Sequence, residues 1–278
     1  MKVALLAVSL TLLSATASAA PPDFPASKLV RIGEQYVKEG KDDRAQKVLE
    51  DALKKDPKNA EAYYLLGMVH SRAGEDDPAR LKEAASNLEK SLALDPRRYE
   101  AWLLLGMVKD LGGDHPAAAA TYRKAIAQFP DRPEAYQELG ATLILLNKPD
   151  DAAKELEAAA SRSPEDDEIL LDLGYAQILG QKCDKALETL KKAEKLNRRS
   201  PLIPSLKGDA HACVGQTDDA IAAYEVAVKR DPQNERAWFH LGLMRSKKGE
   251  KEAARQALEK ALALDPKNAK AKEALDRL

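Results

Sequence analysis

The apolar residues of the chain form helical stripes that come in pairs. Residues 133–165 show the pattern, with small or apolar residues recurring every three or four positions in both halves: Tyr136, Leu139, Gly140 and Leu143, then Ala152, Leu156 and Ala159. This spacing places the residues of each half on one face of a helix. The stretch therefore predicts two antiparallel amphipathic helices joined by a short turn.

The same pair of helices recurs along the chain. A glycine marks the first half of each pair, at Gly33, Gly67, Gly106, Gly140, Gly174, Gly208 and Gly242. The spacing is 34 residues everywhere except between Gly67 and Gly106, where it is 39. Prolines follow the same period and end most pairs, at Pro57, Pro96, Pro130, Pro164, Pro232 and Pro266. A fixed period of this kind predicts a protein built from seven repeated units.

Residue size and capping side chains explain how such a unit would fold. Small residues such as Gly140 and Ala152 let the two helices approach, while Leu139 and Leu156 fill the space beside them. Proline disfavours the helical conformation of the residue before it and so ends the second helix. Three asparagines stand two positions after a proline and are expected to cap the next helix: Asn59, Asn234 and Asn268.

The order of these residues resembles the tetratricopeptide repeat family, whose 34-residue signature is W-x2-L-G-x2-Y, then A-x3-F, then P. The last unit carries Trp238, Leu241, Gly242, Ala254, Leu258, Ala261 and Pro266 in that order. The resemblance implies an all-α fold, a right-handed α-α superhelix of about seven repeats plus a C-terminal capping helix. The expected units are 26–59, 60–98, 99–132, 133–166, 167–200, 201–234 and 235–268, with the capping helix at 269–278.

Three units depart from the signature. The second contains five extra residues within "RAGEDDPARLKEA", which we expect to form a decorated turn between its helices. The sixth opens with Pro204 and Lys207 where Trp and Leu normally stand, and the fifth ends without a proline. The second half of the sixth unit is regular, so we expect this unit to be degenerate rather than missing.

The first nineteen residues differ in kind from the repeats. Lys2 is followed by an apolar run over 3–13 and by an A-x-A cleavage site at Ala17, Ser18 and Ala19. This pattern is typical of a secretory signal peptide, here 1–19, followed by a short linker at 20–25. An uncleaved anchor helix is the alternative. We therefore expect an exported protein of bacterial type, periplasmic or secreted after cleavage near Ala19, with no direct membrane insertion afterwards.

Charge and motifs argue against nucleic-acid binding and catalysis. The 45 acidic and 44 basic residues nearly cancel, so no overall field attracts nucleic acid. The sequence has no G-x-S-x-G, phosphate-loop or G-x-G-x-x-G motif. The four histidines are scattered, and His211 with Cys213 gives two ligands where zinc needs at least three. We expect no enzymatic activity, no cofactor and no metal.

The two cysteines lie in neighbouring units. In a stack of this type, Cys183 at the turn of the fifth unit and Cys213 near the end of the first helix of the sixth share one edge. An exported protein meets an oxidising compartment, which favours a Cys183–Cys213 disulfide. Two partly buried thiols are the alternative.

The resemblance also indicates which residues face a ligand. In this family they come from recurring places on the first helices, which here hold Tyr64, Leu65, Met68, Leu103, Leu104, Met107, Ile144, Leu145, Leu171, Tyr175, Ile178 and Leu179. The same face carries the carboxylates Glu61, Glu100, Glu134, Glu138, Glu168 and Asp172. We expect an apolar concave groove with an acidic fringe, suited to protein or peptide segments with apolar and basic residues.

Two functions remain open at this point. The chain is expected to be a non-catalytic protein–protein interaction scaffold in the cell envelope that holds partner segments in the groove. Alternatively, it is a structural assembly subunit of an envelope complex such as a pilus, secretion or motility machine. The residues between the repeat signatures decide which partner binds, and the signatures themselves do not.

Overall fold

The computed structural model describes residues 24–74 and 77–278, so the signal peptide expected at 1–19 lies outside the described residues. Within these residues the chain forms fifteen α-helices and no strand. The first helices of the seven pairs are α1 (Ala26–Lys38), α3 (Ala60–Ala73), α5 (Tyr99–Leu111), α7 (Pro133–Leu145), α9 (Asp167–Leu179), α11 (Leu202–Cys213) and α13 (Glu235–Lys248). The second helices are α2 (Asp42–Lys55), α4 (Pro78–Leu94), α6 (His115–Gln128), α8 (Pro149–Arg162), α10 (Cys183–Leu196), α12 (Thr217–Arg230) and α14 (Lys251–Leu264), and α15 (Ala269–Asp276) closes the chain.

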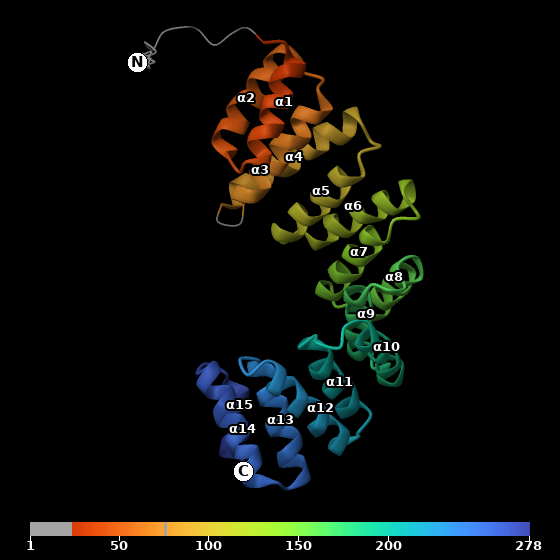
Figure 1. The fold of residues 1–278 in the computed structure, drawn as a ribbon, viewed down its shortest axis with the longest axis vertical. Helices are drawn as coiled ribbons and strands as arrows, with labels where there is room; N and C mark the ends of the chain where they lie inside the picture. Colours follow the sequence, from red (N-terminus) through yellow and green to blue (C-terminus); the bar gives the residue numbers. More distant parts are fainter. Residues whose placement is uncertain (1–23, 75–76) are drawn as a thin grey trace, which may run out of the picture.

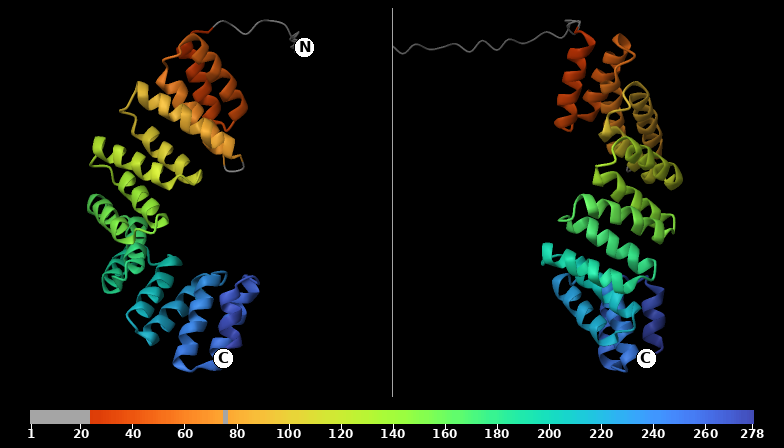
Figure 2. Two further views of the ribbon diagram at one scale, coloured as in Figure 1. Left: turned by 180° about the vertical axis from the view of Figure 1, so that it is seen from behind. Right: turned by 90° about the vertical axis from the view of Figure 1, so that its right-hand side faces the viewer.

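The pairs stack side by side into a curved superhelix (Figure 1). Each helix packs on the next one in the chain, and the first helices of neighbouring units also contact each other from α1 through α13. The views from front and back place α5, α7 and α9 on the hollow side and α6, α8 and α10 on the outer side (Figures 1 and 2). The predicted all-α superhelical repeat fold is confirmed.

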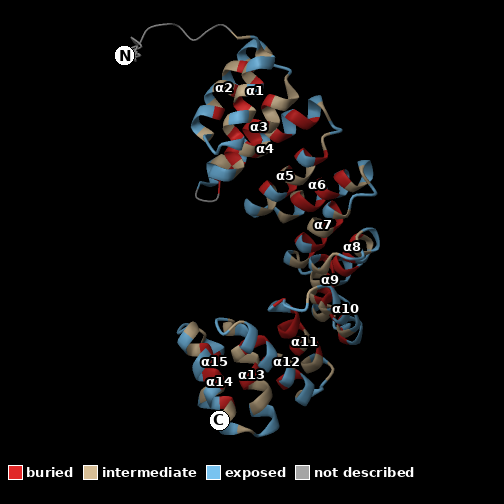
Figure 3. Cartoon of the chain, in the orientation of Figure 1, coloured by how far each residue is buried: buried red, intermediate tan, exposed pale blue. Residues whose placement is uncertain are grey.

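A glycine against a large side chain fixes the spacing of the two helices in every unit. The pairs are Gly33 with Leu49, Gly67 with Leu88, Gly106 with Tyr122, Gly140 with Leu156, Gly174 with Leu190, Gly208 with Tyr224, and Gly242 with Leu258. A Cβ atom on Gly140 would lie 2.5 Å from Cγ of Leu156, too close for two carbon atoms. Buried residues accordingly concentrate between the paired helices (Figure 3).

The connectors between units are held by caps. The side chains of the three asparagines predicted from the sequence accept hydrogen bonds from the backbone N–H groups three residues later: Asn59 from Ala62 at 3.0 Å, Asn234 from Ala237 at 2.9 Å and Asn268 from Ala271 at 2.9 Å. Each bond satisfies one of the N–H groups that a helix leaves unpaired at its start. The capping role expected of these residues is confirmed.

Aromatic residues at the signature tryptophan position form hydrogen bonds to three of the connectors between units. Their polar groups donate to the carbonyl oxygen of the proline six residues earlier: Trp102 to Pro96 at 2.8 Å, Tyr136 to Pro130 at 3.1 Å and Trp238 to Pro232 at 3.0 Å. The sixth unit has Pro204 at this position and lacks such a donor. In these three units the signature residue does more than fill the core, because it also bonds to the end of the unit before it.

The insertion in the second unit differs from the expectation of a decorated turn. Helix α3 has 14 residues and α4 has 17, whereas α5 and α6 have 13 and 14. Four of the five extra residues therefore lengthen helices, and one lengthens the connection. Pro78 explains this, because proline is tolerated in the first turn of a helix and so can start the longer α4.

The cysteine pair expected from the sequence lies at disulfide distance. Cys183 is the first residue of α10 and Cys213 the last of α11, and their Cα atoms are 6.1 Å apart. The bond joins the fifth unit to the sixth, whose first helix has only 12 residues and begins after Pro201. The covalent link therefore lies beside the most irregular unit of the stack.

Helix α15 covers the end of the last pair. Ala271 packs against Leu258 and Ala261 of α14, and Leu275 and Leu278 pack on the same cluster. Without α15 these apolar side chains would meet water, so the helix acts as the cap that solenoid ends require. None of the described helices is long and apolar enough to cross a membrane.

Candidate functional site

Most of the residues predicted to face a ligand lie half-buried along the inner side of α3, α5, α7 and α9. This group comprises Tyr64, Met68, Leu103, Leu104, Glu138, Ile144, Leu171, Asp172, Tyr175 and Ile178. Met107 and Glu134 are exposed. Part of each half-buried apolar side chain packs on the core, and the remainder faces solvent.

Leu65 is the exception and the prediction for it is wrong. The side chain is only 3 % exposed and packs with Leu66 and Val69 between the first two units. Among neighbouring first helices, α1 and α3 make the most extensive contact, so more of the surface of α3 is covered than that of α5, α7 or α9. Leu65 is therefore a core residue in this structure.

Each of the three central first helices ends with an exposed leucine. Leu111, Leu145 and Leu179 are 60 %, 62 % and 41 % exposed, and each is the last residue of its helix, α5, α7 or α9. We call these three residues the leucine row. Sequence reasoning placed Leu145 and Leu179 on the ligand-facing side and missed Leu111, although the 34-residue period alone would have found it. Met107, 43 % exposed, lies one helical turn before Leu111.

Two of the carboxylates expected in the acidic fringe are neutralised. Glu61 is paired with Arg98, whose guanidinium carbon lies 4.6 Å from the centre of the Tyr64 ring. Glu134 pairs with Arg132 at 3.3 Å and also accepts a hydrogen bond from the Tyr99 hydroxyl at 3.1 Å. Burial alone would raise the pKa of Glu134, but these hydrogen bonds outweigh it and the pKa is lowered.

The other four carboxylates of the fringe, Glu100, Glu138, Glu168 and Asp172, form no ion pair among the described residues. Glu100 and Glu168 are exposed, whereas Glu138 and Asp172 are half-buried. Burial raises the pKa of Glu138, and the nearby carboxylates of Asp110 and Asp172 raise it further. Burial also raises the pKa of Asp172, although Gln137 donates a hydrogen bond to it at 2.9 Å. The acidic character of the inner face is therefore concentrated on α7 and α9, where α7 also places Ile144 and α9 places Leu171.

The sixth and seventh units contain a polar cluster that the sequence did not reveal. Tyr224 donates a hydrogen bond to Oδ1 of Asp209 at 2.6 Å, and Arg236 pairs with Oδ2 of the same residue at 2.6 Å. The ring of His240 stacks on Tyr224 with 5.8 Å between centroids, and burial lowers its pKa. Asp209 is thus a paired, buried carboxylate that holds α11, α12 and α13 together.

Models of one repeat family match this chain over most of its length. Three models described as tetratricopeptide or TPR repeats match residues 79–133 and 206–269, residues 33–74, and residues 111–160 and 143–209. Together they cover residues 33–74 and 79–269, which contain all or part of every helix pair. The chain belongs to the tetratricopeptide repeat family. Proteins of this family generally mediate protein–protein interactions, and the fold is typically a non-catalytic scaffold.

Solved structures of other tetratricopeptide repeat proteins share the fold. The C-terminal part of a repeat protein from Cytophaga hutchinsonii has a TM-score of 0.70 and 18 % identity, over 88 % of this chain and 99 % of that one. YrrB, described as a TPR protein with an unusual peptide-binding site, has a TM-score of 0.56 and 21 % identity, over 70 % of this chain and 100 % of YrrB. A chain of the APC/C hetero-tetramer Cut9-Hcn1 has a TM-score of 0.64 and 18 % identity, over 91 % of this chain. The match spans about half of that relative, 51 % of its length. No curated protein matches the chain significantly.

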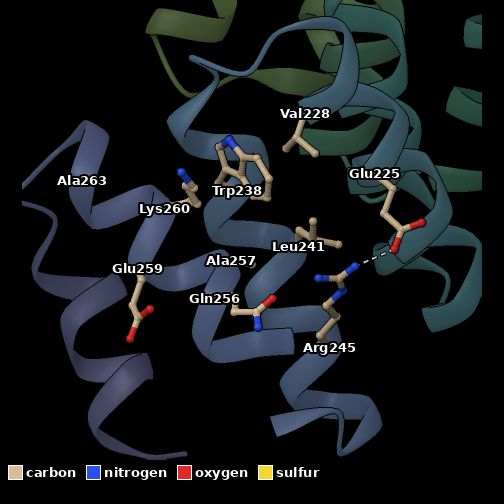
Figure 4. Close-up of a pocket in the computed structure, with 10 residues that line it drawn as sticks. All are labelled: Glu225, Val228, Trp238, Leu241, Arg245, Gln256, Ala257, Glu259, Lys260 and Ala263. Carbon is tan, nitrogen blue, oxygen red and sulfur yellow. Dashed lines mark hydrogen bonds and ion pairs between the residues drawn. The ribbon is translucent and has the colours of Figure 1, made fainter. Parts of the chain in front are cut away.

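A cleft in the last two repeats lies between α12 and α14, over α13 (Figure 4). It has a volume of about 630 Å³, and Trp238, Leu241 and Val228 supply its apolar walls. Glu225 and Arg245, which line it, form an ion pair at 2.7 Å. Glu259 and Lys260 also line the cleft, so its two acids are matched by two bases and it presents no excess charge.

The described part of this repeat protein contains no group of three His, Cys, Asp or Glu side chains placed to hold a metal ion. The buried titratable groups instead serve packing, as Tyr99 shows by donating to Glu134 and accepting from the backbone N–H of Ala135 at 3.0 Å. The inner face offers apolar contact and negative charge, which are means of binding a partner.

Proposed function

We propose that this repeat protein is a non-catalytic scaffold of the cell envelope that binds segments of partner proteins along its inner face. The leucine row at the ends of α5, α7 and α9, together with the unpaired carboxylates of α7 and α9, is the observation that carries the proposal. Exposed apolar side chains in a continuous row are typical of interaction surfaces. A partner segment with apolar and basic residues would complement both features.

The geometry of the row suits a segment that crosses the helices. One leucine is supplied by each of three consecutive units, so a partner that runs along the stack meets one apolar contact per unit. Basic side chains of the same segment would reach Glu138 and Asp172, whose charges lack a partner among the described residues.

Affinity capture from an envelope extract tests the proposal. The bait is the protein without residues 1–19, in three forms: unchanged, with Met107→Asp and Leu145→Asp together, and with Ser161→Asp as control, since Ser161 is exposed on the outer helix α8. We expect the double variant to lose at least tenfold of the captured partner, while the control keeps it. Equal capture by all three forms would contradict binding at Met107 and Leu145 on the inner face.

The envelope location rests on the N-terminal pattern alone. A signal peptide at 1–19 directs a chain across a membrane and is removed afterwards. Expression of the full chain in a bacterium with two membranes, followed by fractionation and intact-mass measurement, tests this part. We expect a periplasmic protein whose mass corresponds to cleavage near Ala19. A cytoplasmic protein of full length would contradict it.

The oligomeric state separates this role from that of a structural assembly subunit. A peptide-binding scaffold functions as a single copy, whereas an assembly subunit would join copies of itself or a fixed complex. We expect light scattering of the mature protein to give the mass of a monomer. An oligomer that persists on dilution would favour the assembly role.

A further inference from the structure

A pocket opens on the inner face where α9, α11 and α13 meet. It has a volume of about 240 Å³. Its apolar lining comes from Leu171, Tyr175, Leu202 and Leu206, and Ser205 lies among them. Small-molecule and cofactor sites typically measure roughly 300–1,000 Å³. The pocket is below that range and has the size for a side chain of a partner.

The pocket is lined at a repeat position that holds a small residue in this unit. Ser205 corresponds, in steps of 34 residues, to Leu103, Gln137, Leu171 and Phe239 in other units. Ser205 is only 5 % exposed, so it stands where these larger side chains would fill space next to the neighbouring helices. The change lies in the same degenerate unit that has Pro204 at the tryptophan position. The sixth unit therefore carries a cavity that opens toward the groove.

The charge at the pocket is not balanced. Asp172 lines it and forms no ion pair among the described residues. Burial and the carboxylates of Glu168 and Asp166 raise its pKa, against the hydrogen bond from Gln137 that lowers it. The one guanidinium in the lining, that of Arg236, is bound to Asp209 at 2.6 Å. A further cation at the pocket would be attracted electrostatically to the Asp172 carboxylate. This attraction is stronger than in bulk water because the site is partly desolvated. The pocket thus complements an apolar side chain accompanied by a cation.

We propose that this pocket is an anchor site for one aliphatic side chain, leucine or methionine, of a partner segment whose neighbouring lysine or arginine pairs with Asp172. The proposal rests on the proposed function, because the segment would lie on the same inner face as the leucine row. Burying an aliphatic side chain is worth enough to change affinity by about 10- to 100-fold. The anchor would fix the register of the segment, while the row supplies contact along its length.

Selection from a displayed library of random dodecapeptides supplies the probe. Peptides enriched on the mature protein are synthesised with a fluorescent label, and their dissociation constants are measured by anisotropy. We expect the enriched peptides to share an aliphatic residue close to a lysine or arginine. Ser205→Leu, which installs the side chain found at Leu103 and Leu171, should weaken their binding by about 10- to 100-fold.

Two further comparisons separate pocket filling from damage to the fold. Ser161→Leu makes the same exchange at an exposed place on α8 and should leave binding unchanged. Replacing the aliphatic residue of a peptide by alanine should lower its affinity for the unchanged protein. The same replacement should hardly change its affinity for the Ser205→Leu variant, in which the pocket is already filled. Asp172→Asn should lower the affinity for peptides that contain the basic residue. It should not change the affinity for peptides in which that residue is replaced by alanine. Circular dichroism melting of each variant reports its folding.

The outcomes distinguish this proposal from the proposed function. One outcome would overturn the anchor pocket and leave the binding face in place. In it, the peptides bind the Ser205→Leu variant as tightly as the unchanged protein but fail to bind the double variant Met107→Asp with Leu145→Asp. Peptides that bind all variants equally, or a library that yields no aliphatic and basic consensus, would overturn both. A Ser205→Leu protein that does not fold shifts the decision to Leu202→Asp at the exposed rim, where weakened binding supports the pocket and unchanged binding contradicts it.

Discussion

At the residue scale, each unit depends on the absence of one side chain. The first-helix glycine faces Leu or Tyr of the second helix in all seven units of the described chain. Glycine is otherwise unfavourable within a helix, by about 1 kcal/mol relative to alanine. Its presence at these places is therefore explained by close packing and not by helix formation.

Gly106→Ala tests this explanation. The added Cβ would overlap the ring of Tyr122, which is fully buried and has little freedom to move. We expect the free energy of unfolding to fall by about 1–3 kcal/mol, measured by urea denaturation. Gly112→Ala is the matched control, because its Cβ would meet nothing nearer than 3.4 Å. Equal stability changes for the two variants would contradict close packing at Gly106.

Glu138→Gln tests the electrostatics of the inner face. The pKa of Glu138 is raised in the folded protein by burial and by Asp110 and Asp172, so the ionised form opposes folding. This cost is present above the folded pKa and disappears below the unfolded pKa of about 4.3. Glutamine should therefore raise the urea midpoint at pH 7 and have little effect near pH 3.5. A midpoint lowered at pH 7 would mean that Glu138 has a stabilising partner.

The repeat period predicts the residues of the core and caps, but not the pairing of long side chains. Gly140, Leu156 and Asn234 follow from the sequence because each repeats a local rule of size or hydrogen bonding. The neutralisation of Glu61 depends on Arg98, 37 residues later, and on how far that side chain reaches. The cavity at Ser205 likewise appears only when the side chains of three helices are placed together.

At the element scale, helix ends are where sequence and structure differ most. The insertion near Pro78 was expected to enlarge a turn and instead lengthens α4 to 17 residues. Residues such as Ala, Leu, Lys and Glu favour a helix once an N-cap residue has started it. Here Asp77 is the N-cap of α4, because its side chain accepts a hydrogen bond from the backbone N–H of Ala79 at 2.9 Å. The length of the insertion was therefore evident from the period, whereas its conformation depended on a local cap.

The disulfide between α10 and α11 should stabilise the irregular sixth unit. Its two cysteines are 30 residues apart in sequence. In the chain-entropy model, closing a loop of that size stabilises the folded state by about 3–4 kcal/mol. We expect replacement of Cys183 and Cys213 together by serine to lower the free energy of unfolding by that amount, measured by urea denaturation under oxidising conditions. Reductant should lower the stability of the unchanged protein and leave the serine variant unaffected.

Thiol titration provides the direct check on this bond. The unreduced mature protein, denatured in guanidinium chloride, should show no free thiol. Two free thiols would contradict the disulfide and remove the stabilisation assigned to it.

At the scale of the whole molecule, the stack is held by contacts between neighbours. Each helix packs on the next, and the first helices of adjacent units touch, so the stability of one unit depends mainly on those beside it. The sequence predicted this architecture well, because a period sustained over seven units leaves few alternative folds. The path of the inner face, and which of its residues reach solvent, needed the three-dimensional arrangement.

Removal of residues 269–278 tests the nearest-neighbour account. Without α15, the apolar cluster around Leu258 and Ala261 loses its cover. We expect hydrogen exchange to become faster in α13 and α14 and to stay unchanged in α1–α6. Uniformly faster exchange along the chain would show that the stack unfolds as one unit, and unchanged exchange would show that α15 is not a cap.

The central claim is that the inner face of α5, α7 and α9 holds the partner, and site-specific photo-crosslinking tests it most directly. A photoreactive phenylalanine analogue is placed at Met107, at Leu145 or, on the outer helix α8, at Ser161, and irradiated with the captured partner bound. We predict covalent products from the first two positions and none from the third. Products from Ser161 alone would contradict the claim and move the binding surface to the outer face.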